Sequence, residues 1–374
     1  RVRVQQVPWS AAHEKLLTAF VAGALPDLVQ VGTTWIPELA ALGALEPLDA
    51  RLAAAEPALD RADFFAGALD AASERGVTWA LPWYADTRLL FYRRDLFAAA
   101  GIPEPPATWS GWRAALARVA APGGPERDAL LLPLGEWELP VVFALQHGAS
   151  LLRDGDRYGD FRSPAFRAAF DFYLSFFRDG LAPLAGATRL ANLHQDFAAG
   201  LFAAFLSGPW QLGELRRRLP PEFEERWATA ALPALDAPGS DAAPGVSVAG
   251  GAGLALVKGS RWQDAAWRLA LFLAEPAQQV AFYERTGDLP ARRSSWDAPV
   301  LRDDAKARAF RVQLERARAA PRVPEWERIA SRIARHAESA ARGSESADEA
   351  VVALDRETDR LLEKRRSLLA ARAP

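Results

Sequence analysis

The chain has 374 residues and a formal net charge of −2; half of its residues are hydrophobic and a quarter are charged. This length exceeds what one ordinary core requires, so we expect two domains. The near-neutral charge excludes a global basic field for nucleic acid or anionic lipid. No apolar run approaches the ~20 residues needed to span a bilayer. Cysteine is absent, which excludes disulfides, cysteine nucleophiles and thiolate metal sites.

Methionine is absent too, so we expect the chain to be a processed or truncated form of its translation product. Residues 1–7 alternate like a strand, and Ser10 is the expected N-cap of a helix over residues 11–22. A buried strand at residues 27–31 follows, and a second helix begins near Pro37. This order of strands and helices predicts a mainly parallel sheet.

Residues 77–82 and 87–92 predict two more strands. We expect the stiff segment Pro103-Glu104-Pro105-Pro106 to carry the chain between two lobes. Thr108 is the expected cap of the next helix, in which Trp109 and Trp112 should pack in the core. A strongly amphipathic helix begins at Ser163-Pro164, and its aromatic stripe is expected to be core: Phe166, Phe170, Tyr173, Leu174 and Phe177.

In the second half, residues 246–258 predict one long strand or a strand pair interrupted by glycines. Two helices are predicted over residues 260–274 and 276–285. Ser260 with Gln263 fits the spacing of a capping box, and Pro276 fits a first helical position. From about residue 305 the tail is predicted to be helical.

Tryptophan is the most informative residue type, because several of the 13 stand in segments that read as loops. A loop aromatic beside a polar residue suits the apolar face and polar rim of a sugar ring. Ordinary packing is the competing interpretation for each of them. The segments are Pro8-Trp9, Thr34-Trp35, Pro82-Trp83-Tyr84, Glu136-Trp137-Glu138 and Gly208-Pro209-Trp210.

Enzyme motifs are largely missing from the sequence. The glycines at 250, 251 and 253 do not fit a dinucleotide fingerprint, because Leu256 stands where glycine or alanine is needed. His13-Glu14 lacks the second histidine of a zinc-protease motif, and the four histidines have no metal-ligand spacing. Ser247 matches a nucleophile elbow poorly, since a strand follows it. We therefore expect no catalytic residue, no metal and no cofactor.

Carboxylates among aromatics could still perform glycoside chemistry. The candidates are Asp86, Glu136 and Glu138. The alternative role for such groups is to bind the hydroxyls of a ligand, which we prefer for Asp86 and Glu136.

Several segments together resemble one family, the extracellular solute-binding proteins of carbohydrate ABC transporters, which includes maltose-binding protein. Their order and spacing along the chain carry the resemblance. They are Val7-Pro8-Trp9-Ser10, Leu25-Pro26-Asp27-Leu28-Val29-Gln30, Leu42-Gly43-Ala44-Leu45-Glu46-Pro47-Leu48, Leu81-Pro82-Trp83-Tyr84-Ala85-Asp86-Thr87-Arg88, Phe91-Tyr92-Arg93-Arg94-Asp95-Leu96-Phe97, Pro106-Ala107-Thr108-Trp109, Phe197-Ala198-Ala199-Gly200, Ser207-Gly208-Pro209-Trp210, Ala249-Gly250-Gly251, Ala265-Ala266-Trp267, Phe272-Leu273 and Gly287-Asp288-Leu289-Pro290-Ala291-Arg292.

The resemblance implies a two-lobed α/β fold, with a mainly parallel sheet in each lobe and a ligand cleft at the hinge. It places an N-terminal lobe at residues 1–93 plus 247–295 and a C-terminal lobe at 94–246 plus 296–374. Family members carry a strand and a helix before the segment equivalent to residues 1–7, and we expect that unit to be missing from this chain. The partners implied are a carbohydrate and the permease of an ABC importer. The protein is expected to be an exported monomer in the periplasm or cell envelope, either free or lipid-anchored.

Ligand capture would combine aromatic stacking with charged hydrogen bonds. Trp83, by contrast, is expected to face the core. Arg88 has the competing role of pairing with Asp86 across a turn, and Arg292 that of a salt bridge between the lobes. The candidate ligand-binding residues are Trp9, Trp35, Tyr84, Asp86, Arg88, Glu136, Trp137, Trp210, Gly250, Gly251 and Arg292.

The leading hypothesis is thus a non-catalytic importer component that binds a maltose- or trehalose-type sugar. One alternative is a glycoside-active enzyme that uses Asp86 with Glu136 or Glu138. The other is a binding protein for a non-sugar solute such as a polyamine, which should show an excess of acidic residues in the cleft.

Overall fold

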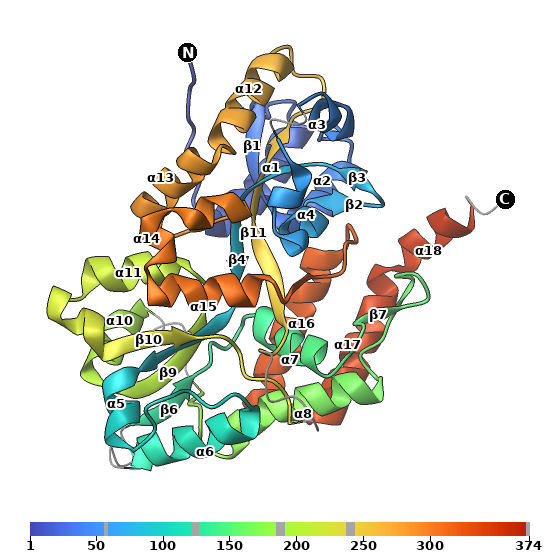
Figure 1. The fold of residues 1–374 in the computed structure, drawn as a ribbon. Coiled ribbons are helices and arrows are strands. Elements are labelled where there is room, and N and C mark those ends of the chain that lie inside the picture. Colours follow the sequence, from blue (N-terminus) through green and yellow to red (C-terminus); the bar gives the residue numbers. More distant parts are fainter. Residues whose placement is uncertain (56–58, 122–126, 185–190, 237–243, 372–374) are drawn as a thin grey trace.

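The computed structural model describes residues 1–55, 59–121, 127–184, 191–236 and 244–371. Two sheets lie one above the other in Figure 1, and helices surround each of them. The predicted two-lobed α/β fold is therefore confirmed. The strand pairing inside the lobes differs from the prediction.

The sheet of the first lobe runs in the order β1 (Leu28–Gly32), β11 (Ser247–Leu256), β4 (Leu81–Thr87) and β12 (Leu289–Pro290). These neighbours pair antiparallel, whereas β13 (Ala317–Ala319) joins β11 in parallel. A mainly parallel sheet was the wrong prediction. The physical reason is that β11 enters from the other lobe and runs against both β1 and β4.

The sheet of the second lobe has the order β10 (Trp227–Ala230), β5 (Leu89–Arg93), β9 (Phe202–Ser207) and β6 (Asp128–Leu131). Here β6 and β9 are parallel, and the other two pairs are antiparallel. Every residue of β5 is buried, as expected for a strand with neighbours on both edges and covered faces.

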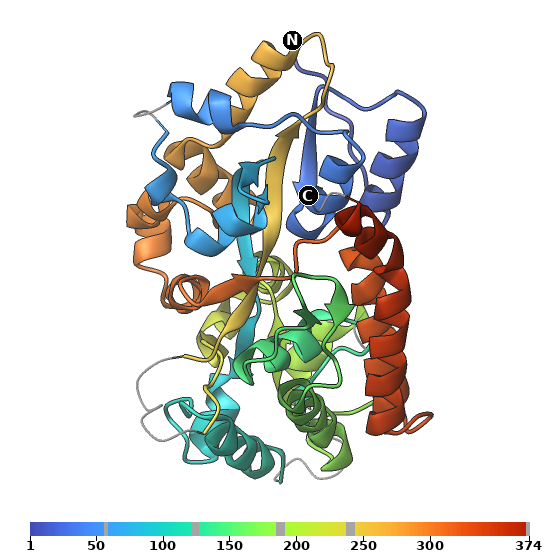
Figure 2. The same cartoon turned by 90° about the vertical axis from the view of Figure 1, so that its right-hand side faces the viewer.

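Helices cover both sheets, and the C-terminal helices stand along one side of the second lobe (Figure 2). The first lobe carries α1 (Trp9–Val21), α2 (Ile36–Ala41), α3 (Asp49–Ala55), α4 (Ala66–Ala71), α12 (Gln263–Leu273) and α13 (Pro276–Thr286), with the short hairpin β2 (Ser73–Glu74) and β3 (Val77–Thr78). The second carries α5 (Arg94–Ala99), α6 (Trp109–Ala120), α7 (Glu138–Gln146), α8 (Pro164–Arg178), α10 (Leu193–Ala199) and α11 (Trp210–Arg218), with the hairpin β7 (Leu152–Arg153) and β8 (Tyr158–Gly159). The last part of the chain forms α14 (Pro299–Arg302), α15 (Ala305–Leu314), α16 (Trp326–Ala341), α17 (Ala347–Leu361) and α18 (Glu363–Ala370).

Three segments join the lobes side by side. The first is Arg88, which links β4 of one sheet to β5 of the other. The second is the start of β11, where the Ser247 hydroxyl donates to the Arg88 carbonyl at 2.8 Å and accepts from its amide at 3.2 Å. The third is β13, which pairs with Ser247–Ala249. The chain thus passes from the first sheet to the second at Arg88, close to the predicted lobe boundary at residue 93. The lobe boundaries themselves stay a prediction.

Local sequence signals account well for the helices of the second lobe. The Thr108 side chain caps α6, and Ser163 caps α8 ahead of its N-terminal proline. Trp109 and Trp112 are fully buried, as predicted. The aromatic stripe of α8 is buried except for Phe177, which is partly exposed and packs against the same core.

Four local predictions were wrong. Residues 1–7 form no strand and have no sheet partner within the described ranges, so their alternating pattern has no neighbouring strand to pair with. Helix α1 begins at Trp9 after Pro8, which places Ser10 inside the helix. The segment at residues 103–106 lies within the second lobe between α5 and α6. Ser260 caps no helix, because α12 begins only at Gln263.

Candidate functional site

The candidate site begins where β4 and β11 run side by side, next to the lobe crossing. Their register pairs Gly250 with Asp86 and Ala252 with Tyr84. Gly251 has a φ of 106°, and a Cβ at this position would lie 2.3 Å from the Tyr84 carbonyl oxygen. Glycine is required here by both backbone conformation and close approach. The register therefore brings four predicted residues together.

Arg88 connects this strand pair to the second lobe. Its Nη1 donates to both carboxylate oxygens of Asp86, at 3.2 and 3.0 Å, and its Nη2 donates to Oε1 of Glu138 at 2.7 Å. The Arg88 side chain is 9% exposed. Burial raises the pKa of Asp86, and the adjacent guanidinium opposes that rise. Arg88 therefore pairs with Asp86 across the turn, which was one of its two predicted roles. Because it also binds Glu138, the pair is part of a bridge between the lobes.

Trp210, the first residue of α11, presents its ring to this bridge. The Arg88 guanidinium carbon lies 4.9 Å from the ring centroid, within the range of a cation–π contact. Gly208 lies under the ring, and a Cβ there would come within 2.0 Å of it. Glycine at 208 therefore determines where the indole can lie, and the partly buried Trp210 keeps some of its surface available.

Glu136 and Trp137 lie just before α7, whose first residue is Glu138. Burial raises the pKa of Glu136 to about 7; Arg88 lowers it, and Glu138 and Asp86 raise it further. The Trp137 ring instead meets Trp326 edge-on at 5.3 Å and packs against the core of the second lobe. Trp137 therefore supports the wall of the site by packing.

Tyr84 and Asp288 extend the polar surface on the first lobe. The Gln30 side chain donates to the Tyr84 hydroxyl at 3.0 Å. Burial raises the pKa of Asp288 to about 6, and the charge of Asp86 raises it further. The Tyr84 ring lies 5.8 Å from Phe282, which also contacts Trp83 at 4.4 Å. Trp83 was expected to face the core. It packs against the core but is only partly buried.

Trp9 and Trp35 form a stack of their own, with centroids 4.5 Å apart. Trp35 is buried, whereas Trp9 is 51% exposed. The His13 ring also stacks on Trp35, with ring centroids 5.3 Å apart. Its Nε2 forms a hydrogen bond of 2.8 Å with Oε2 of Glu38. The hydrogen bond to Glu38 raises the pKa of His13. An exposed indole backed by a buried one is a preformed aromatic surface.

Glu327, at the start of α16, lies between the two parts of the site. Its surroundings connect it to both parts: Thr34 and His13 oppose the rise in its pKa that burial causes, and the charge of Glu138 reinforces that rise. Burial raises its pKa, and within the described residues its Oε1 has no hydrogen-bond partner. A buried carboxylate oxygen without a partner is an acceptor that a ligand hydroxyl could satisfy.

Arg292 is the predicted residue that stands apart. Its Nε donates to Asp63 at 2.6 Å, its Nη1 donates to the Ala274 carbonyl, and its guanidinium lies over Phe64. Asp63 and Arg292 both lie beside the sheet of the first lobe, where Phe64 forms a β-bridge with Arg292, so the pair does not bridge the lobes. Its packing role is evident from these contacts.

Sequence reasoning missed several residues that the structure adds to the site. Asp288 lies in one of the family-like segments, but the sequence assigned it no role. His13 drew attention only as part of an incomplete zinc-protease motif. Glu327 carried no sequence signal, because it follows a proline-broken stretch of the helical tail. The added residues are His13, Gln30, Thr34, Glu38, Asp288 and Glu327.

The arrangement offers chemistry suited to a polyhydroxylated guest. Aromatic faces come from both lobes, and buried carboxyl groups with raised pKa values can accept and donate hydrogen bonds. Ion pairs already orient Asp86 and Glu138 through Arg88. Such a site can hold a neutral ligand by stacking and charge-assisted hydrogen bonds without further cofactors.

Two sheets joined by three crossing segments define a two-lobed binding-protein fold. A family model described as bacterial extracellular solute-binding protein matches residues 1–280, and the chain belongs to this family. The predicted resemblance is therefore confirmed. Among the described residues, no helix combines the length and apolar character needed to cross a membrane.

Comparison with individual proteins agrees with this assignment. The chain is similar to the sugar-binding protein MalE from the phytopathogen Xanthomonas citri, with a TM-score of 0.92 and 43% identity, covering 100% of this chain and 93% of that chain. It is 28% identical to a putative binding protein of Brucella abortus, over 87% of this chain and 76% of that relative. It is 25% identical to the diacetylchitobiose binding protein DasA of Streptomyces coelicolor, over 87% of this chain and 74% of DasA.

Proposed function

We propose that this protein captures a mono- or oligosaccharide between its two lobes and delivers it to the permease of an ABC importer. The observation that carries the proposal is the bridge at the crossing. There Arg88 binds Asp86 and Glu138 while its guanidinium lies against Trp210. An aromatic face beside oriented charged groups matches the apolar face and hydroxyl rim of a sugar.

The same bridge explains how a ligand could favour closure. Asp86 belongs to the first lobe, and Glu138 and Trp210 come from elements of the second. A guest that contacts all three groups binds fully only when the lobes are together, so it shifts the population toward that state. Micromolar capture needs about −8 kcal/mol, which a few stacks and charge-assisted hydrogen bonds can supply.

We further infer that the protein binds without turnover. Glycoside hydrolysis needs one carboxyl group free as acid and another as nucleophile or base. Here Arg88 engages both Asp86 and Glu138, so neither is free as the nucleophile or base, and Glu136 is left without a second free carboxyl group among the three candidates. The similar proteins named above are binding proteins. Membership of an extracellular family supports a place outside the cytoplasm, in the periplasm or cell envelope, and action as a monomer is part of the proposal.

A maltose- or trehalose-type ligand is the first choice for testing, because the similar MalE structure is that of a sugar-binding protein. Native mass spectrometry of the purified protein against a panel of mono- and disaccharides tests the proposal. We expect a one-to-one complex with a single sugar class and no hydrolysis product. Turnover of chromogenic glycosides, or no complex with any sugar, would contradict the proposed function.

One observation favours a second candidate, a binding protein for a cationic amine. Acidic side chains outnumber basic ones in the site, as expected for a polyamine binder. The basic residues are Arg88 and His13, and the acidic residues are Asp86, Glu136, Glu138, Asp288 and Glu327. A bound polycation would favour the charged carboxylates, so its affinity would fall as the pH drops below about 7. A neutral sugar should show little such dependence. Adding spermidine to the panel at two pH values distinguishes the two ligand classes.

A further inference from the structure

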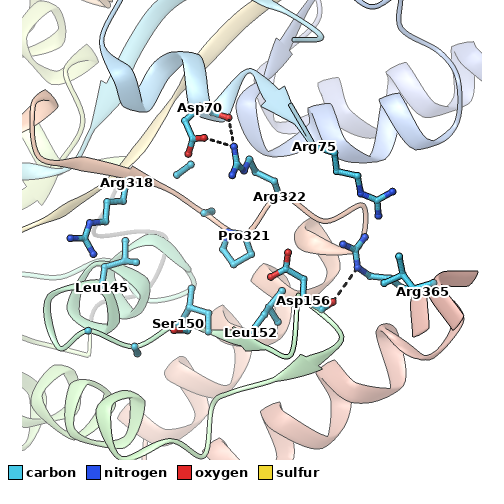
Figure 3. A pocket seen from close by; sticks show the side chains of 17 residues that line it. Asp70, Arg75, Leu145, Ser150, Leu152, Asp156, Arg318, Pro321, Arg322 and Arg365 are labelled. Carbon is cyan, nitrogen blue, oxygen red and sulfur yellow. Dashed lines mark hydrogen bonds and ion pairs between the residues drawn. The ribbon is translucent and has the colours of Figure 1, made fainter. Parts of the chain in front are cut away.

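A cavity lies between the lobes, and its lining residues differ from those of the site described above. It is open to solvent, has a volume of about 710 Å³, and is lined by residues of both lobes and of the segment that crosses between them. Asp70 and Arg75 come from the first lobe, residues 148–152 and Asp156 from the second, and residues 318–322 from the segment that crosses between them (Figure 3). None of the predicted sugar-site residues lines this cavity.

The lining is strongly basic. Four arginines and two aspartates contribute to it, which leaves two positive charges uncompensated within the lining. The arginines are Arg75, Arg318, Arg322 and Arg365; the aspartates are Asp70 and Asp156. A cavity with one sign of charge and low-dielectric walls concentrates counter-ions of the opposite sign.

Two of these guanidinium groups lack a carboxylate partner within the described residues. Arg365 is 9% exposed, and its interaction in the structure is a donation from Nε to the Asp156 carbonyl at 3.1 Å. The Arg318 side chain makes no hydrogen bond or ion pair in the part of the chain that the structure describes, although its backbone pairs with β11. A buried charge without a counter-charge is costly, so Arg365 has reason to bind an anion.

The other two arginines are differently engaged. Arg322 pairs with Asp70. Arg75 lies 3.4 Å from Glu74, its neighbour in sequence, and its side chain stays 51% exposed. In Figure 3 the guanidinium groups of Arg75 and Arg365 point toward one another from the two lobes. Two like charges that approach each other in this way are stabilised by an anion placed between them.

The backbone around the cavity is also unusual. Of the four non-glycine residues with positive φ in the described chain, three line this cavity: Arg75 at 50°, Leu151 at 60° and Asp156 at 61°. Such conformations are disfavoured for residues with a Cβ. Arg75 lies in the turn of the β2–β3 hairpin and Asp156 in the turn of the β7–β8 hairpin, where positive φ is usual, so both hairpin turns reach this cavity.

We propose that this cavity binds a small oxyanion of the phosphate type, held between Arg75 of the first lobe and Arg365 of the second. The planar fork of a guanidinium matches two oxygens of such an anion. Arg318 supplies further positive charge along the wall, whereas Arg322 is already paired with Asp70. The site is independent of the sugar-binding proposal, because no residue is shared between them.

The anion site should nevertheless be coupled to the sugar site. Both sites draw residues from both lobes, so each is complete at a particular arrangement of the lobes. In the structure, the Arg88 bridge and the arginine cavity exist together. An anion that binds this arrangement therefore favours it, and by linkage a sugar that favours the same arrangement raises the affinity for the anion by an equal factor.

Calorimetric titration with inorganic phosphate, at matched ionic strength in chloride, tests the proposal. We expect saturable binding of one phosphate per chain, weakened about tenfold or more in Arg75→Gln and in Arg365→Gln. Arg302→Gln is the matched control, since Arg302 is exposed and pairs with the adjacent Asp303 as Arg75 does with Glu74. The control should bind phosphate like the wild type.

Arg365 is buried, so the melting temperature of its variant must be measured alongside. Arg75→Gln keeps the test valid if Arg365→Gln fails to fold, because Arg75 is exposed. Absence of saturable phosphate binding, or equal weakening in all three variants, would overturn the proposal. Flotation with phosphatidylglycerol vesicles distinguishes a lipid headgroup: capture by vesicles without binding of free phosphate would also overturn it.

Discussion

Replacement of Trp210 by alanine tests the aromatic half of the proposed sugar site. Trp210 is the first residue of α11 and is partly buried, and its ring centroid lies 4.9 Å from the Arg88 guanidinium carbon. A stacked aromatic contact contributes about 0.5–1.5 kcal/mol beyond area burial, and burial of an indole face against a guest adds about 1–2 kcal/mol. We therefore expect the Kd for the sugar to rise about tenfold or more.

Isothermal titration calorimetry with the sugar selected by mass spectrometry measures this change. Trp262→Ala is the matched control, because Trp262 is exposed and has the Arg261 guanidinium 5.5 Å from its ring. That variant should bind like the wild type. Both variants should keep the wild-type fold by circular dichroism, since neither ring is a fully buried core group.

Gly208→Ala provides a companion test that keeps the indole. A Cβ at 208 would lie 2.0 Å from the Trp210 ring, so the ring must move away from Arg88. We expect a loss of affinity similar to that of Trp210→Ala. Unchanged affinity in Trp210→Ala, or an equal loss in Trp262→Ala, would refute the reasoning.

Three further predictions follow from the charges and the backbone of the site. Arg88→Gln should abolish sugar binding and lower the free energy of unfolding at neutral pH by about 3 kcal/mol, because it leaves two mostly buried carboxylates uncompensated; urea denaturation with wild-type stability would contradict this. Burial raises the pKa of Glu136 from its ordinary 4.5 to about 7. The protonated Glu136 therefore contributes fully to the free energy of unfolding below about pH 4.5, and this contribution falls by roughly 3 kcal/mol as the pH rises to about 7. Glu136→Gln should remove that fall in unfolding measurements at about pH 5 and pH 8, and an unchanged pH profile would count against it. Gly251→Ala should destabilise the fold more than Gly43→Ala, because both glycines have positive φ but only the first has the Tyr84 carbonyl within 2.3 Å of an added Cβ; equal losses of melting temperature would show that the close approach is unimportant.

The sequence allowed much of the fold and part of the site to be predicted. Caps and amphipathic patterns located α6 and α8, because these signals act within a few residues. Strand direction could not be derived, since β11 lies far along the chain from the strands it joins. Residues 1–7 show the same limit: an alternating pattern becomes a strand only beside a partner strand.

The site was predictable where its residues share a motif. Tyr84, Asp86 and Arg88 lie on one strand and its end, so one local pattern indicated all three. Glu327 could not be found, because the packing of α16 against the second lobe brings it to the site. Arg292 shows the converse, a charged residue in a family-like segment whose ion pair with Asp63 lies within one lobe.

The most direct test of the account is a crystal structure of the protein with its captured sugar. We predict that the sugar ring lies against Trp210, with hydroxyls bonded to Asp86, Arg88 and Glu136, and with both lobes in contact with it. A sugar bound in another place, such as the arginine-lined cavity, or one that contacts a single lobe, would contradict the central claim.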